Sequence, residues 1–501
     1  MTSPFSPPLV EAGPAVHHAE AAQRNAAVAD EAATELDAML TGASDNKRLL
    51  LKAAAGAGKS YVLRRLVVEA ASHAHVSRVA VAAFTNKQVL PLAEQLGEAL
   101  GKDKVCLFVS KGKFDDVPVE VHAVATVVSK YADIPGSARV VVATCSKLGI
   151  QYGAKWLEKA LGKGANGKTI FDVLFVDEAW QIPHHLFDEP SRLAPLWVGV
   201  GDVGQLPPLE VGENPWRGDD GFNPYRAWPT DYDDDAKTWT RELPAVWRPA
   251  AGHLELWRAF YPEWGSLDCV AAPGDRRLDL GSIAAPFDTL WAQVGTGVPT
   301  LLEIDGLPEP ESPDVDLPLM EFIEAALDAF FAGGASLQAA LYDATGAPTG
   351  ASSRVAPGGD HSDPMATILA TRNQAVDDAA DAVDRLRERH GLTERDLVSS
   401  TVDSYQGQTN GITVALHPLN GASELDEFNS AFGRLAVTCT RATHGLLVVA
   451  RPGLDELLDD APARPGTPFG EPGNRQLPRQ THQRILATFA RGRIAVAGEE
   501  E

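Results

Sequence analysis

The chain has 501 residues, 44% of them hydrophobic and 22% charged, a composition ordinary for a globular protein of two or three domains. Its formal net charge of −24, taken alone, argues against binding of nucleic acid, because a net-negative surface repels a polyanion. A local groove can still bind phosphates, because salt screens charges more than about 8–10 Å apart.

The first part of the chain alternates between short apolar runs and amphipathic stretches. Residues 1–45 begin Pro-rich and continue as an Ala-rich helical segment. From Lys47 the strand-like runs are RLLLKA, RVAVAAF, KVCLFV, ARVVVAT, FDVLFVD and PLWVGVGD, with helical stretches such as 60–72 and 90–100 between them. This alternation predicts an α/β domain with a parallel sheet, which we assign to 46–240.

A loop rich in Pro, Asp and Trp, at about 210–240, separates this domain from a second, smaller α/β domain at 241–451. Residues 344–363 are expected to form a flexible insertion in it, and 452–501 a linker and C-terminal tail with a short basic helix near 479–493. The second domain is expected to have helices at 252–261, 318–331 and 373–390, and strands at 365–371, 397–402, 411–416 and 445–450.

The segment Ala53-Ala-Ala-Gly-Ala-Gly-Lys-Ser60 follows a predicted strand and precedes a predicted helix. Glycines allow backbone N–H groups to turn toward one point, and the helix N-terminus adds a favourable dipole for phosphate. The sequence therefore predicts a nucleotide-triphosphate site formed by Gly56, Ala57, Gly58, Lys59 and Ser60. Lys59 would contact the β- and γ-phosphates, and the Ser60 hydroxyl would bind Mg²⁺.

Two adjacent carboxylates end the apolar run FDVLFVD, about 120 residues after the phosphate loop. Asp177 is expected to hold Mg²⁺ and Glu178 to orient and deprotonate the attacking water, which is the division of roles that phosphoryl transfer needs. Asp177 and Ser60 are thus the predicted metal residues, and ATP with Mg²⁺ the predicted cofactors.

Further segments follow in a fixed order: FTNK (84–87), ATC (143–145), GDVGQLPP (201–208), LPAVWRP (243–249), ILATRNQ (368–374), TVDSYQGQT (401–409) and RLAVTCTRA (434–442). Together with the phosphate loop and the carboxylates, this series resembles the motifs of superfamily 1 helicases across roughly residues 47–451. The details look most like the branch of the nonsense-mediated-decay helicase and its 5′-to-3′ relatives. The resemblance implies two RecA-like P-loop domains in tandem.

The resemblance also implies roles for single residues. Gln205 would sense the γ-phosphate from the first domain, and Gly407 would face the phosphates. Arg248 and Arg441 would reach the γ-phosphate across the interdomain cleft and stabilise transition-state charge. Gln23 would read the adenine edge, as a glutamine upstream of the phosphate loop does in this family. Thr409 stands where the family often has Glu.

Polar side chains near strand ends are expected on the opposite, nucleic-acid-facing side, where hydroxyls and amides suit contacts to sugar and phosphate. Trp180 and Tyr405 are open to two interpretations, base stacking or packing. The predicted nucleic-acid residues are Thr85, Asn86, Lys87, Thr144, Thr401 and Ser404.

The leading functional interpretation is an ATP-driven helicase or translocase on single-stranded DNA or RNA, with DNA slightly favoured. The alternative is a nucleic-acid-gated ATPase switch or clamp within a larger complex, because no long inserted domain separates the motifs. A protein partner such as a nuclease subunit would fit either.

We expect no membrane span, because no apolar run reaches about 20 residues, and no secretion signal. Widely spaced Cys106, Cys145, Cys269 and Cys439 are expected to be free thiols in the cytoplasm.

Overall fold

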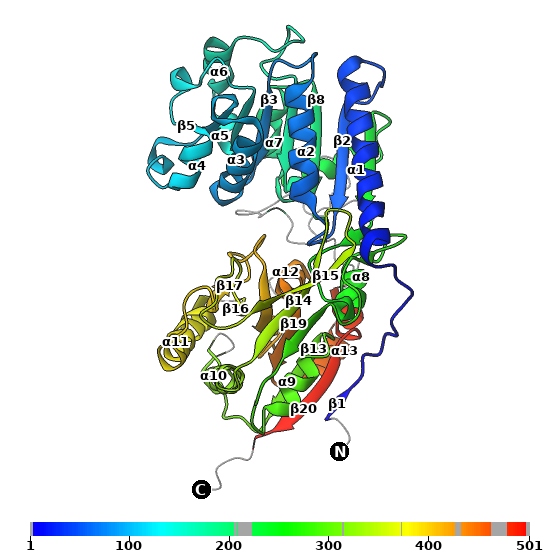
Figure 1. Cartoon of the computed structure of the whole chain (residues 1–501), viewed down its shortest axis with the longest axis vertical. Coiled ribbons are helices and arrows are strands. Elements are labelled where there is room, and N and C mark those ends of the chain that lie inside the picture. Colours follow the sequence, from blue (N-terminus) through cyan, green and yellow to red (C-terminus); the bar gives the residue numbers. More distant parts are fainter. Residues whose placement is uncertain are drawn as a thin grey trace.

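A computed structural model describes residues 4–204, 208, 223–312, 315–371, 373–425, 432–461 and 478–496 of the chain. These residues form two α/β units, one above the other along the long axis of the molecule (Figure 1). Helix α1 (His18–Thr41) lies beside the first unit, and both ends of the described chain belong to the second unit. The predicted α/β class with two parallel sheets is confirmed.

The first unit is built on an eight-stranded sheet of order β5-β4-β6-β3-β7-β8-β2-β9, in which all neighbours are parallel. Its strands form from continuous apolar runs because both faces of the sheet are buried. The six predicted strands are confirmed, and β5 and β9 are additional. The strands are β2 (Arg48–Ala53), β3 (Val79–Ala83), β4 (Val105–Phe108), β5 (Thr126–Val128), β6 (Val140–Thr144), β7 (Val173–Asp177), β8 (Leu196–Gly201) and β9 (Thr238–Leu243).

Helices cover both faces of this sheet and divide its core into two parts. Buried side chains of α1, α2, α3 and α4 pack on one face, and those of α5, α6 and α7 on the other. Because β9 continues to Leu243, the first sheet includes residues on both sides of the proposed domain limit at 240/241. The helices are α2 (Lys59–Ser72), α3 (Asn86–Leu100), α4 (Val119–Val124), α5 (Cys145–Leu148), α6 (Gly153–Leu161) and α7 (His184–Ser191).

The second unit has a seven-stranded sheet of order β1-β20-β13-β19-β18-β16-β17, parallel except for the pair β1–β20. The four strands predicted here are confirmed as β16 to β19. The strands are β1 (Phe5–Ser6), β13 (Thr300–Asp305), β16 (Ala366–Ala370), β17 (Leu397–Thr401), β18 (Asn410–Leu416), β19 (Ala442–Ala450) and β20 (Ala490–Ala495).

The helices of the second unit pack in two groups. Buried residues of α9, α10 and α11 form a core of their own, whereas those of α8, α12, α13 and α14 join the cluster that also contains α1 and α2 of the first unit. The three predicted helices are confirmed as α8, α10 and α11. No helix in the described ranges is long and apolar enough to cross a membrane. The helices are α8 (Leu254–Phe260), α9 (Asp288–Val294), α10 (Leu317–Ala332), α11 (Asn373–His390), α12 (Phe432–Cys439), α13 (Leu454–Asp460) and α14 (Pro478–Leu486).

The prediction that 452–501 is only a linker and tail is wrong. Of the expected basic helix, only α14 forms, and the chain then becomes β20, which pairs along its whole length with β13. Phe5 and Ser6 pair with the other side of β20. The arginines that suggested a helix instead neutralise acids beside the strand, because Arg491 bonds Asp455 and Arg493 bonds Asp305.

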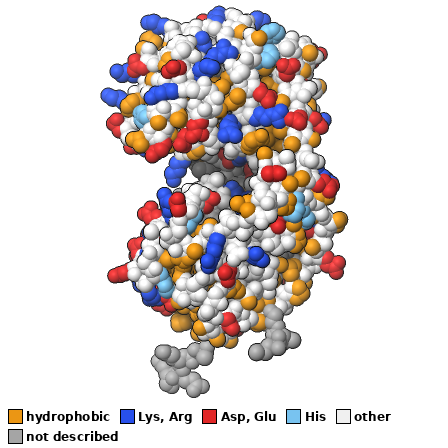
Figure 2. Space-filling model, in the orientation of Figure 1, with side chains coloured by type: hydrophobic (Ala, Val, Ile, Leu, Met, Phe, Trp, Pro, Cys, Tyr) orange, Lys and Arg blue, Asp and Glu red, His pale blue; other side chains and the backbone are white. Residues whose placement is uncertain are grey.

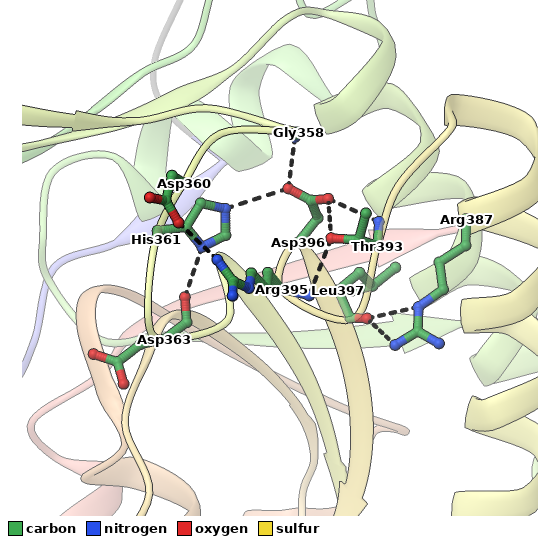
Figure 3. Close-up of polar contacts among 9 residues, drawn as sticks. All are labelled: Gly358, Asp360, His361, Asp363, Arg387, Thr393, Arg395, Asp396 and Leu397. Atoms are coloured by element: carbon green, nitrogen blue, oxygen red, sulfur yellow. Dashed lines mark hydrogen bonds and ion pairs between the residues drawn. The ribbon is translucent and has the colours of Figure 1, made fainter. Parts of the chain in front are cut away.

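The prediction of a flexible insertion at 344–363 is also wrong. Much of it forms β15 (Pro348–Val355), which pairs antiparallel with β14 (Ser336–Tyr342), and β14 pairs with β12 (Arg276–Asp279). The loop after β15 is held by Asp396, whose carboxylate accepts from the Gly358 amide at 2.8 Å and contacts His361 at 3.3 Å (Figure 3). The insertion is therefore an ordered hairpin with an anchored loop.

Candidate active site

The phosphate loop joins the carboxyl end of β2 to the start of α2 at Lys59. Gly56 and Gly58 have left-handed backbones, with φ of 75° and 89°. A Cβ on Gly56 would lie 2.3 Å from the Cβ of Arg248, so this close approach requires glycine. Ala57, between the two glycines, is buried, and Ser60 is exposed at the first turn of the helix. Glycine turns, a helix N-terminus, a lysine and a hydroxyl are thus combined as a nucleotide phosphate needs them.

A buried amide from α1, which the sequence analysis did not identify, holds the loop in place. Asn25 donates to the Ala57 carbonyl at 2.9 Å and to the Ala245 carbonyl at 2.7 Å, and accepts from the Ala245 amide at 2.8 Å. A lone Asn inside an Ala-rich helix was the available signal. Gln23 is exposed two residues earlier, so its adenine contact stays a prediction.

The two predicted carboxylates lie at the end of β7, against the phosphate-loop lysine. Lys59 forms an ion pair with Glu178, whose own backbone is left-handed at φ 50°. One oxygen of each acid, Asp177 Oδ1 and Glu178 Oε2, is buried without a hydrogen-bond partner among the described residues. Such orphaned oxygens are costly unless a ligand completes the site.

The charges in this site perturb one another. Burial raises the pKa of Asp177 to about 6, although Lys59 opposes the shift. Burial would lower the pKa of Lys59, but Glu178 and Asp177 outweigh it and raise that pKa. A hard divalent cation prefers oxygen ligands and would favour the ionised acid. The orphaned oxygen of Asp177 and the exposed hydroxyl of Ser60 therefore fit Mg²⁺, with phosphate oxygens supplying further ligands. Among the described residues, no group of three or more His, Cys, Asp or Glu side chains could hold a metal alone.

Asp202, just after β8, is a second residue that sequence reasoning missed. Its carboxylate accepts from the Tyr261 hydroxyl at 2.7 Å and from the Gly204 amide at 2.9 Å. The Tyr261 oxygen in turn accepts from the amide of Ala55 in the phosphate loop at 3.1 Å. Gln205, the predicted γ-phosphate sensor, lies outside the described residues.

The two predicted arginines approach each other from opposite sides of the domain interface. Arg248 follows β10 (Ala245–Val246), which pairs with β11 (Asp268–Cys269) next to the phosphate loop, and Arg441 follows α12. Arg248 donates to the Thr440 carbonyl at 3.0 Å, across the interface. Figure 2 shows a hollow between the two units on one face of the molecule.

Neither guanidinium has a carboxylate partner within ion-pair distance among the described residues. Burial and the neighbouring charge of Arg441 lower the pKa of Arg248 to about 9. Burial also lowers the pKa of Arg441, although the nearby carboxylates of Asp202 and Glu178 act to raise it. Arg441 donates to the Gln408 carbonyl at 3.3 Å, which puts the Gly407 turn beside it, while its Nε has no partner in the described ranges. Two like charges held together without an acid favour binding of an anion.

The predicted nucleic-acid residues lie at the carboxyl ends of strands, as expected. Thr85 follows β3 and caps α3, Thr144 ends β6 and caps α5, and the Thr401 hydroxyl at the end of β17 accepts from the Ser404 amide at 3.1 Å. Asn86, Lys87 and Ser404 are exposed. Each threonine thus orders a turn at a strand end, and their strand contacts stay a prediction.

Base stacking on Trp180 or Tyr405 does not fit the structure. Trp180 is 6% exposed and Tyr405 is 2% exposed. Tyr405 is further fixed by a 3.0 Å hydrogen bond to Thr367. Both rings are packing residues, which was the other interpretation of these aromatics.

The segment from the end of α1 through the phosphate loop and the acid pair to just after β8 is similar to one known family. Residues 36–210 match the AAA domain family. The match covers 175 of the 501 residues and includes the phosphate loop and both carboxylates. No curated protein matches the chain.

Among solved structures, the chain is similar to a PRRSV helicase, with 15% identity, a TM-score of 0.38, and coverage of 85% of this chain and 58% of that one. It is also similar to Arterivirus nonstructural protein 10, a helicase, in complex with DNA, with 15% identity, a TM-score of 0.38 and coverage of 84% and 64%. The chain thus spans less than two thirds of the length of these proteins.

Proposed function

We propose that this chain is a nucleic-acid-dependent ATP hydrolase of the superfamily 1 helicase kind, with its ATP site in the cleft between the two units. The observation that carries the proposal is the approach of Arg248 and Arg441, which have no acid partner among the described residues, to a phosphate loop whose lysine is paired with Glu178. A triphosphate between the units would contact cations from both, so binding and closure would be coupled.

The chain's own groups suggest a sequence of events. ATP would draw the Lys59 ammonium to its β- and γ-phosphates, which frees Glu178 from its ion pair. Glu178 would then accept the proton of the attacking water, and Arg248 and Arg441 would stabilise charge on the transferred phosphoryl group. Mg²⁺ held by Ser60 and Asp177 would neutralise phosphate charge when bound. Adenine recognition by Gln23 and γ-phosphate sensing by Gln205 and Gly407 belong to the same proposal.

The substrate we propose is a single strand, with DNA slightly favoured over RNA, moved from 5′ to 3′ as the branch resemblance implies. Thr85, Asn86, Lys87, Thr144, Thr401 and Ser404 would contact its sugars and phosphates. The four cysteines are free and buried, which supports our proposal that the protein works in the cytoplasm.

A second candidate function is a gated ATPase switch that clamps a strand within a larger complex, without processive unwinding. Melting a base pair costs about 1–2 kcal/mol in stacking. The sequence has no long insertion between its motifs that would form an extra domain for this work. The net charge of −24 also disfavours non-specific attraction to phosphate. A partner such as a nuclease subunit would then supply strand separation.

One pair of assays tests these proposals. ATP hydrolysis is measured with no nucleic acid, with single-stranded DNA and with RNA, and single-turnover unwinding is measured with a 5′ or a 3′ tail. The motor predicts stimulated hydrolysis and unwinding of the 5′-tailed duplex only. Stimulated hydrolysis without unwinding would favour the switch, a 3′ preference would assign the other direction, and no stimulation by either strand would refute both functions.

A further inference from the structure

The lysines of this acidic chain are concentrated in one region. All 15 lie before residue 238, and ten of them lie between residues 102 and 168. Residues 145–168 carry five lysines and one acid, Glu158, so this stretch is locally basic in a chain of net charge −24. Figure 2 shows Lys and Arg side chains over the upper left of the first unit, where α4 and α6 lie (Figure 1). The lysine-rich surface of the molecule therefore lies on the first unit.

Helix α6 presents large aromatic side chains outward within this region. Its Leu157 and Leu161 are buried against the sheet, as in an ordinary amphipathic helix. Its outer side carries Trp156, 54% exposed, and the residue before the helix is Tyr152, 63% exposed. Tyr152 immediately precedes the helix and Trp156 lies in its first turn, so both exposed rings belong to the beginning of α6. Exposed rings of this size gain free energy when a partner covers them.

Each ring has a lysine beside it. The Lys155 ammonium is 5.6 Å from the centroid of Tyr152, and the Lys159 ammonium is 5.7 Å from that of Trp156. Lys155 and Lys159 are exposed, and neither has a carboxylate within ion-pair distance in the described part of the chain. Lys163, also exposed, lies 3.9 Å from Glu158. The surface thus combines two rings with two lysines, Lys155 and Lys159, that no acid of the described residues pairs with.

The position of α6 relates this surface to the strand-end residues. Thr144 ends β6 at the carboxyl edge of the sheet, and β7 begins at the opposite edge. The segment between them, with α5 and α6, must cross from one edge to the other. Tyr152 follows α5 on this crossing and Lys163 follows α6. Figure 1 shows α6 at the end of the first unit that faces away from the second unit, so the surface lies away from the carboxyl edge at which Thr144 stands.

We propose that the α6 surface, formed by Tyr152, Lys155, Trp156, Lys159 and Lys163, binds the part of a long single strand that extends beyond the strand-end track of the motor. The inference rests on the proposed function and adds a second contact region to it. The rings stack on bases, and the ammonium groups contact the adjacent phosphates. Every base has a π face, so this surface binds without sequence preference and increases affinity only for strands long enough to reach it.

The chemistry favours a strand over a protein partner. A protein that covered this face would need a carboxylate for each unpaired lysine and apolar pockets for two flat rings. A nucleic acid offers phosphates and flat bases in regular alternation, which matches alternating Lys and aromatic side chains. The alternating phosphates and bases of a strand thus complement the alternating lysines and aromatic rings of the surface.

The test measures strand binding by fluorescence anisotropy, without nucleotide, for single-stranded DNA and RNA of about 10 and about 30 nucleotides, lengths chosen to fill one site or extend beyond it. The variants are Trp156→Ala, Tyr152→Ala and Lys155→Ala/Lys159→Ala. The controls are Tyr61→Ala, which removes an equally exposed ring beside Arg64 on the other face of the sheet, and Lys237→Ala, which removes an exposed cation elsewhere. Circular dichroism checks that each variant is folded.

For the long strand, we expect each aromatic variant to weaken binding about tenfold, and the lysine variant to lower the salt slope by about 2. The short strand and both controls should bind as the unaltered protein does. Unchanged long-strand binding by all three variants would overturn the inference, while short-strand binding would still support the proposed function. Failure of the unaltered protein to bind any strand would instead refute the proposed function.

Discussion

The hydroxyl of Tyr261 donates a 2.7 Å hydrogen bond to the carboxylate of Asp202 while it accepts a 3.1 Å hydrogen bond from the amide of Ala55. One phenol therefore joins the end of β8, the phosphate loop and the segment after α8. Burial raises the pKa of Asp202 to about 6, despite opposition from Lys59 and the two hydrogen bonds it accepts. The connection is thus made with a carboxylate that is costly to ionise.

This cost gives a pH-dependent stability prediction for Asp202→Asn. Because the folded pKa of Asp202 lies above its ordinary 3.8, the favourable contribution of its protonated form is full below about pH 4 and is lost as pH rises through 6. Asparagine keeps an oxygen acceptor and has no charge. We expect the variant to be more stable than the unaltered chain at pH 7.5, by about 1–3 kcal/mol, and equal to it near pH 4. Urea unfolding at both pH values measures the difference.

Asp396→Asn is the matched control, because it should change the stability at pH 7.5 in the opposite direction. Although burial opposes it, the hydrogen bonds that Asp396 accepts from Thr393 and Gly358 lower its pKa. The ionised Asp396 carboxylate therefore stabilises the fold above its unfolded pKa, and this contribution to stability is lost as pH falls through its folded pKa. Asp396→Asn should therefore destabilise the chain at pH 7.5. An Asp202→Asn variant that is also less stable at that pH would contradict our account of the Asp202 site.

Lys59→Ala should lower ATP turnover at least about a hundred-fold, because in the described site no other amine lies beside the carboxylate pair to neutralise the β- and γ-phosphates. The variant also leaves Glu178 buried without its ion-pair partner, so its thermal unfolding midpoint should fall. Phosphate release and thermal melts measure the two effects. Lys52→Ala, which removes a lysine of β2 that is paired with Asp233, is the control. Normal turnover by Lys59→Ala would refute the hydrolase assignment.

Glu178→Gln should bind ATP but hydrolyse it at least about a hundred-fold more slowly, because the amide cannot accept the proton of water. The variant should also retain single strands in an ATP-dependent manner, which filter binding with and without ATP measures. Glu189→Gln, at an exposed acid paired with Arg192 on α7, is the control for a lost surface charge. Hydrolysis at the ordinary rate would show that Glu178 is not the base.

Arg441→Ala should leave ATP binding to the first unit nearly unchanged and lower kcat about a hundred-fold or more, because its charge is supplied from the second unit. Equilibrium binding of a fluorescent ATP analogue and steady-state kinetics separate the two parameters. Arg389→Ala removes a half-exposed arginine of the same unit, paired with Asp328, and should have no effect. If kcat stayed normal, the second unit would not complete the site.

The sequence predicted the first unit well because its strands are contiguous apolar runs, and each chemical motif lies directly at the end of one. Elements held by distant partners were harder to predict. The residues of β20 alternate arginine with small or apolar side chains, and only pairing with β13 and bonds to Asp455 and Asp305 make them a strand. The residues of β15, with Ser, Thr and Gly among them, suggest a flexible insertion for the same reason, because only pairing with β14 makes them a strand.

The site shows the same division. Lys59, Asp177 and Glu178 could be predicted because phosphate chemistry fixes their types and their places after strands. The partnerships of Asn25 with Ala245 and of Asp202 with Tyr261 join residues 220 and 59 positions apart, and nothing local in the sequence specifies them. Burial of Trp180 and Tyr405 likewise depends on which residues pack over them in three dimensions.

The pairing of β1 with β20 has a practical consequence for observing the molecule at work. Because both ends of the described chain belong to the second unit, a dye or fusion attached at either end would report the position of that unit alone (Figure 1). A second dye on the first unit, for example at the exposed position Glu98, would complete a distance ruler across the cleft. Energy transfer between the two would then record opening and closing in real time, with both labels outside the catalytic residues.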